Sequence, residues 1–132
     1  MTPVDRQKLL IERTRKFTPA VYDTTINAGE TQEFVFVYGG PMSEIAGHKI
    51  GCRSCTTVTK VDNGLKVAFT APPRSDYESQ IAEGKKSSKY TSNVTVYFED
   101  GEPTQKFNEK QELTDNPDKV PISLQIRATI VF

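Results

Sequence analysis

The chain has 132 residues, a length that suits one domain built around one hydrophobic core. Its 17 basic and 17 acidic side chains cancel, which removes any global electrostatic reason to bind nucleic acid or an anionic membrane. No apolar run approaches the roughly 20 residues that span a bilayer, and the first residues lack the apolar centre of a secretory signal. We therefore expect no membrane association and a reducing compartment, in which two cysteines do not make a disulfide framework.

Residues 5–16 predict a short helix, capped by Thr2 or Asp5, with a loose apolar stripe at helical spacing. The stripe consists of Leu9, Leu10, Ile11, Thr14 and Phe17. Two interpretations stay open: a helix lying across one end of the domain or fraying there, and an arm that docks on a neighbouring subunit or an acidic surface. We treat residues 1–17 as this arm and residues 18–132 as the main domain.

From Phe17 onward the apolar period changes to two, which is typical of strands. Residues 21–26 predict a weak strand, and residues 33–38 predict a central strand buried on both faces. Residues 48–61 predict one strand that is interrupted around the cysteines. Asp62, Asn63 and Gly64 then indicate a type I′ hairpin turn into a clean strand at residues 65–70.

Two polar connections, residues 71–89 and 102–118, flank a further strand at residues 90–99, and the first holds a helical turn at residues 77–82. The last strand carries the clearest alternation, with Ile122, Leu124, Ile126, Ala128, Ile130 and Phe132 on one face. About seven strands separated by turn signals predict an all-β fold, an immunoglobulin-like antiparallel β-sandwich with a short N-terminal helix.

The two cysteines and the single histidine, which are His48, Cys52 and Cys55, lie within one short stretch. Zinc prefers four tetrahedral ligands, so a fourth would have to come from Glu44, Asp62, water or another subunit. Residues three apart in an extended strand are about 10 Å apart and face opposite ways, so a metal site or a disulfide requires a turn between the cysteines. Buried or strand-edge thiols, a metal site, and a disulfide or redox pair remain the three alternatives.

The chain shows no nucleophile elbow and no glycine-rich phosphate loop, and His48 is its only candidate imidazole base. We expect no enzyme, no cofactor and no small-molecule substrate.

The distribution of charge along the chain is more informative than any of these motifs. The N-terminal arm and one loop are basic (Arg6, Arg13, Arg15, Lys16, Lys85 and Lys86), whereas residues 99–118 are acidic. This distribution suits packing between neighbouring subunits, and an ordinary surface of mixed charge is the alternative. No aromatic residues are interleaved with the basic arm to stack on bases, which argues against nucleic acid.

The order of motifs from residue 33 to residue 57 resembles a known family. An apolar strand at residues 34–38 precedes a Gly-Gly break, and His-Lys-Ile then leads into Gly-Cys-x-x-Cys-Thr at residues 51–56. Over roughly residues 25–132, this order resembles the DUF1573 group of immunoglobulin-like domains, related to the ASPM/SPD-2/Hydin type. The usual Cys-x-Cys of that group is here Cys-x-x-Cys.

Versions of this size without a leader are similar to small accessory proteins of tailed bacteriophages, in which such modules decorate capsids, necks and tails. The resemblance implies a structural virion component, assembled in the host cytoplasm, whose partners are other virion proteins or further copies of the chain. The main alternative function is a thiol-dependent redox or metal-binding domain at the Cys-x-x-Cys patch, and the alternative location is the cytoplasm. A third possibility is a periplasmic or cytoplasmic adhesion module of the host.

Overall fold

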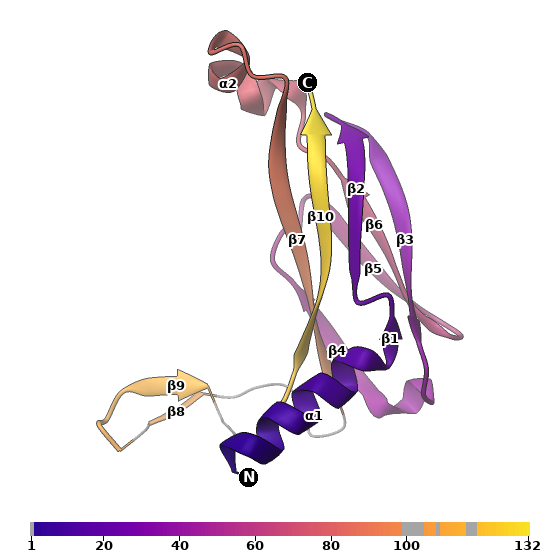
Figure 1. The fold of residues 1–132 in the computed structure, drawn as a ribbon, viewed down its shortest axis with the longest axis vertical. Coiled ribbons are helices and arrows are strands. Elements are labelled where there is room, and N and C mark those ends of the chain that lie inside the picture. Colours follow the sequence, from indigo (N-terminus) through magenta and orange to yellow (C-terminus); the bar gives the residue numbers. More distant parts are fainter. Residues whose placement is uncertain (1, 99–104, 108, 116–118) are drawn as a thin grey trace.

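The chain folds as a sandwich of two four-stranded β-sheets with an N-terminal helix, as Figure 1 shows for the computed structural model. The structure describes residues 2–98, 105–107, 109–115 and 119–132. The helices are α1 (Pro3–Arg15) and α2 (Glu78–Ala82), with 3₁₀ turns at Met42–Glu44 and Arg74–Tyr77. The strands are β1 (Phe17–Thr18), β2 (Val21–Asn27), β3 (Thr31–Tyr38), β4 (Ile45–Ile50), β5 (Thr56–Val61), β6 (Gly64–Thr70), β7 (Ser87–Phe98), β8 (Gln105–Phe107), β9 (Leu113–Asp115) and β10 (Ile122–Val131).

One sheet has the strand order β1-β3-β6-β5 and the other has the order β2-β10-β7-β4. Every neighbouring pair is antiparallel except β2 and β10, which run parallel over seven residue pairs. The predicted β-sandwich is confirmed, but the sheets contain eight strands rather than about seven, and one pair is parallel. The difference arises at the start of the chain, where β1 joins one sheet and β2 joins the other.

The core is formed by alternate residues of the strands from both sheets. In β6 the residues Leu65, Val67 and Phe69 are at most 1% exposed, and the predicted inward face of β10 is buried throughout. Each strand therefore presents one apolar face to the opposite sheet, as a two-layer packing requires. The strand predictions for residues 65–70 and for the last strand are confirmed.

Helix α1 lies across one end of the sandwich (Figure 1), as one of the two interpretations of this segment anticipates. Thr2 caps it: its hydroxyl oxygen accepts a hydrogen bond from the backbone N–H of Asp5 at 3.1 Å, and Pro3 occupies the first helical position. Leu10 packs against the core, while no residue of α1 is fully buried. The proposed boundary at residues 17 and 18 falls within β1, whose Phe17 is 3% exposed.

Strand β3 is central in its sheet, between β1 and β6, but it is not buried on both faces. Phe34, Phe36 and Tyr38 face the core, whereas Val35 and Val37 keep 37% and 38% of their surface exposed. The expectation of two buried faces is therefore wrong, because a sandwich covers only one face of each sheet.

The strand expected over residues 48–61 is in fact two strands in different sheets. Strand β4 pairs with β7, and β5 pairs with β6, so the segment between them crosses from one sheet to the other. We call residues 51–55 the β4–β5 crossover. The hairpin between β5 and β6 is confirmed, but its turn is not type I′, since positive φ angles in the described residues occur only at Gly29, Gly84 and Gln111. Gly64 instead lies in β6, where a Cβ would overlap the carbonyl oxygen of Phe36.

The two polar connections hold short elements of their own. The Arg74–Tyr77 turn and α2 lie at the end of the sandwich opposite α1, and the hairpin β8–β9 projects from the α1 end (Figure 1). Neither helix in the described part of the chain is long and apolar enough to cross a membrane.

Candidate functional site at the β4–β5 crossover

Cys52 and Cys55 form a disulfide within the β4–β5 crossover. The chain turns at residues 53–55 instead of continuing as a strand, and the two Cα atoms are 5.5 Å apart. A disulfide between the cysteines depends on this turn, which brings the distance between their Cα atoms within the range found in disulfides. Of the three alternatives for these residues, the structure contains the disulfide.

The two sulfur-bearing residues differ in exposure. Cys55 belongs to the core and is 6% exposed, whereas Cys52 is half-buried and packs against the core from outside. The other residues of the crossover, Gly51, Arg53 and Ser54, are exposed. The disulfide therefore reaches from the molecular surface into the interior of the sandwich.

A short series of hydroxyl groups surrounds the buried sulfur. Thr56 Oγ1 lies 3.5 Å from Cys55 Sγ and 2.9 Å from Ser92 Oγ, so this contact joins β5 to β7 between the two sheets. Tyr90 Oη approaches Cys55 Sγ to 3.8 Å, and its ring stacks on Phe69 with centroids 5.9 Å apart. Because a disulfide sulfur carries no hydrogen, the hydroxyl groups are the donors in the contacts with Cys55 Sγ.

Thr56 and Ser92 are the two buried polar residues of the described chain, at 3% and 2% exposed. Buried polar groups are costly unless they are hydrogen-bonded, and each of these two satisfies the other. Sequence reasoning missed the Thr56–Ser92 pair because its two residues lie in strands of different sheets. It missed the contact of Tyr90 with Cys55 for the same reason, since Tyr90 lies on β7 and Cys55 directly precedes β5. The crossover is thus held by the disulfide and by polar contacts to β7.

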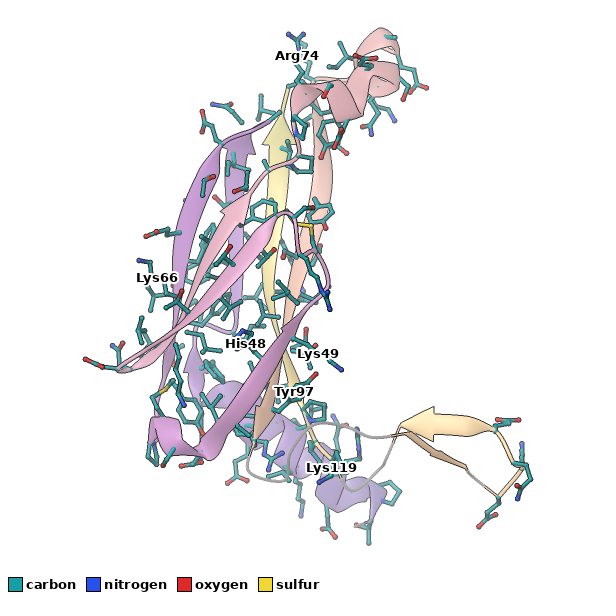
Figure 2. The ribbon with its side chains drawn as sticks, turned by 180° about the vertical axis from the view of Figure 1, so that it is seen from behind. His48, Lys49, Lys66, Arg74, Tyr97 and Lys119 are labelled. Carbon is teal, nitrogen blue, oxygen red and sulfur yellow. A yellow bond between two sulfur atoms is a disulfide. The ribbon has the colours of Figure 1, made fainter. Side chains whose placement is uncertain are left out.

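His48, the third candidate ligand, is not part of this arrangement. It is exposed on β4 opposite Val96, and Figure 2 shows it well along the sandwich from the yellow disulfide. Among the residues that the structure describes, no group of three or more His, Cys, Asp or Glu side chains could hold a metal ion. The structure brings together Cys52 and Cys55 but does not bring His48 to them.

The basic residues of the arm make contacts within the molecule. Arg13 donates from Nη1 to the carbonyl oxygen of Val120 at 2.6 Å, and its guanidinium lies 4.4 Å from the centroid of the Phe98 ring. Arg6 reaches the carbonyl oxygen of Lys119 at 3.5 Å. These contacts fasten α1 to the segment before β10 and to the end of β7.

Lys16 pairs with Glu44, whose carboxylate Oε2 is 3.2 Å from Nζ and also accepts a hydrogen bond from Tyr38 Oη at 3.0 Å. The Tyr38 hydroxyl, followed by Lys16, holds the pKa of the Glu44 carboxyl below its usual value of 4.5. Glu44 is therefore engaged at the α1 end of the sandwich and not in a metal site with His48. Arg15, in contrast, is an exposed residue of α1.

The remaining basic candidates lie at the other end of the molecule. Lys85 and Lys86 follow α2 and are exposed, and Lys85 Nζ is 3.6 Å from a carboxylate oxygen of Glu83. Half of the acidic segment at residues 99–118 lies outside the described residues, and Glu109 and Glu112 are described and exposed. The predicted basic groups thus occupy two separate ends of the sandwich rather than one patch.

No family model, curated protein or solved structure matches the chain. The structure itself defines the class: a mostly β protein, made of two packed sheets with an N-terminal helix and a disulfide at the crossover between the sheets.

Proposed function

We propose that the sandwich has immunoglobulin-like topology. If the strands are lettered in chain order, with β1 and β2 as two halves of strand A, the sheets read A-B-E-D and A′-G-F-C. An immunoglobulin constant-type domain has strands A, B, E and D in one sheet and C, F and G in the other. The split first strand accounts for the additional strand and for the parallel pair of β2 with β10. The short hairpin β8–β9 then lies in the connection between strands F and G.

We further propose that the chain is a non-enzymatic structural protein of a bacteriophage virion, in which it packs against other virion subunits or against copies of itself. The resemblance of residues 25–132 to the DUF1573 group motivates the virion assignment. The observation that carries the interaction role is the position of β8–β9, which projects from the sandwich at the end that also holds α1 (Figure 1).

A two-stranded hairpin is at best marginally stable in water, so a projecting hairpin gains from packing on a neighbouring surface. Helix α1 adds two exposed apolar side chains at the same end, Val4 at 63% and Ile11 at 42% of their surface. Arg13 and Lys16 are occupied within the molecule, which leaves Lys8 and Arg15 as exposed cations of α1 for contact with an acidic neighbour. We define the docking end as α1 together with β8–β9.

Native mass spectrometry of the purified chain, alone and mixed with virion subunits, tests this proposal. We expect an oligomer or a complex that is weakened by Arg15→Glu and by replacement of residues 104–116 with a Gly-Ser linker. Lys86→Glu is the matched control, since it makes the same charge change on an exposed residue at the opposite end of the sandwich. A strict monomer that binds no virion subunit, or equal effects of Arg15→Glu and Lys86→Glu, would contradict the proposal.

A further inference from the structure

We propose that the Cys52–Cys55 disulfide is a thiol–disulfide exchange site on the folded protein, attacked at Cys52 by an external dithiol, with Cys55 as the leaving thiolate. This inference uses residues outside the docking end and is independent of the virion proposal. It rests on two observations. The two cysteines differ in exposure, and the buried Cys55 Sγ has two hydroxyl groups beside it, those of Thr56 and Tyr90, whereas Cys52 Sγ has only that of the exposed Ser54, at 3.6 Å.

The direction of attack follows from access. An incoming thiolate must reach one sulfur from the side opposite the bond that breaks. Cys52 is half-buried among the exposed residues Gly51, Arg53 and Ser54, whereas Cys55 is 6% exposed and belongs to the core. The positive charge of Arg53, next to Cys52 in the chain, also favours the approach of an anionic nucleophile. Cys52 is therefore the sulfur that an external thiolate can reach.

The surroundings of Cys55 suit a leaving thiolate. A thiolate that forms in an apolar interior is strongly disfavoured unless hydrogen-bond donors stabilise it. Tyr90 Oη at 3.8 Å and Thr56 Oγ1 at 3.5 Å are placed to donate to Cys55 Sγ, and Ser92 can donate in turn to Thr56 at 2.9 Å. The stacking of Tyr90 on Phe69 holds the phenol in this position. The buried sulfur thus has two donors ready before the bond breaks.

The reaction balances with a dithiol as the reductant. One thiolate of the dithiol bonds to Cys52 Sγ, the Cys52–Cys55 bond breaks, and its electron pair passes to Cys55, which takes up a proton. The second thiolate of the dithiol then displaces Cys52, which also takes up a proton, and the dithiol leaves as a cyclic disulfide. Two electrons have moved to the protein. Once reduced, Cys55 has the carbonyl oxygen of Cys52 within reach as an acceptor, at 3.7 Å.

Reduction leaves the sandwich in place. Strands β4 and β5 keep their pairing with β7 and β6, and the carbonyl oxygen of Cys55 still accepts from the backbone N–H of Thr70 at 2.7 Å. The four residues between β4 and the buried Cys55 lose their covalent link to the core. The expected consequence is local loosening of residues 51–54, visible as faster amide hydrogen exchange there and nowhere else in the sheets.

A matched pair of variants tests the asymmetry. Cys52→Ser and Cys55→Ser both remove the disulfide, and they differ only in which thiol remains. With an aromatic disulfide reagent such as 5,5′-dithiobis(2-nitrobenzoate) on the folded protein, we expect the thiol left in Cys55→Ser to react about tenfold faster or more than the thiol left in Cys52→Ser. Equal rates, or the reverse order, would overturn the assignment of Cys52 as the attacked sulfur.

Reduction of the unsubstituted chain by dithiothreitol tests the exchange itself. We expect two thiols to become alkylatable while the far-ultraviolet circular dichroism stays native; reduction that occurs only together with unfolding would overturn the proposal. Tyr90→Phe should slow this reduction roughly fivefold, the factor for one hydrogen bond of average net strength. Tyr22→Phe, which removes a hydroxyl that donates to the carbonyl oxygen of Val35, is the control and should leave the rate unchanged. If Tyr90→Phe also leaves it unchanged, the role given to the hydroxyl is wrong.

Discussion

Replacing Arg13 with alanine should detach the middle of α1 from the sandwich. The substitution removes the hydrogen bond from Nη1 to the Val120 carbonyl oxygen at 2.6 Å and the stacking of the guanidinium at 4.4 Å over Phe98. A hydrogen bond from a charged group contributes about 1.5–3 kcal/mol and a cation–π contact about 0.5–2 kcal/mol. Because Arg13 is half-buried and the two contributions are not additive, we expect a loss of about 2 kcal/mol in the free energy of unfolding.

Urea denaturation measures this loss as a lower midpoint at an unchanged slope. For a chain of 132 residues, about 2 kcal/mol corresponds to a fall of about 7 °C in the melting temperature. Arg15→Ala is the control, since Arg15 is exposed on the same helix and should change stability by less than about 0.5 kcal/mol. If both variants unfold at the same urea concentration, α1 is not fastened by Arg13 and the reasoning is wrong.

Two further substitutions test separate parts of the fold. Gly64→Ala should cost about 1–3 kcal/mol, because the added Cβ meets the carbonyl oxygen of Phe36, whereas Gly51→Ala in the open crossover should be neutral in the same urea titration. The lowered pKa of Glu44 means that the stability contributed by its carboxylate is present above pH 4.5 and is lost as the pH falls through the folded-state pKa. Tyr38→Phe should raise that pKa toward 4.5 in an NMR titration, and an unchanged pKa would exclude the hydroxyl as its main cause.

The sequence predicts the buried face of a strand whose alternation is complete, but not that of a strand whose two faces are both apolar. In β10 the inward residues are all buried, because a period of two assigns alternate residues to opposite faces whatever lies beyond them. In β3 the same logic fails for Val35 and Val37, which are apolar yet exposed. Apolar residues on the second face of a strand show that another layer could cover this face. Whether a layer does cover it depends on the tertiary structure.

The role of Arg13 illustrates a second limit. Its charge is visible in the sequence and makes it a candidate contact to another subunit, yet its acceptor lies within the molecule, 107 residues further along the chain. The spacing of residues within α1 carries no information about a carbonyl group that the fold brings to the helix from the segment before β10. The same holds for Ser92, whose hydroxyl meets Thr56 from the other sheet.

For the two cysteines, the sequence states what a disulfide requires, which is a turn between them, but does not tell whether the turn forms. Strand geometry forbids a link between Cys52 and Cys55 unless the chain turns between them, and the same stretch is compatible with either conformation. The turn forms because β4 and β5 belong to different sheets, so the chain has to cross the sandwich at this point. The disulfide is thus a consequence of the sheet topology, and the local sequence pattern does not predict to which sheet each strand belongs.

The docking end and the exchange site are separated along the sandwich, and this separation makes the two proposals independent. Strand β4 begins at Ile45, opposite Phe98 at the α1 end, and five residues later it reaches Ile50 beside the crossover. At about 3.3 Å per residue, that is a distance of roughly 16 Å. Oxidised and reduced chains should therefore bind a virion subunit equally well in native mass spectrometry. A difference in binding would mean that the partner contacts the crossover as well as the docking end, since the strands between them stay paired in both states.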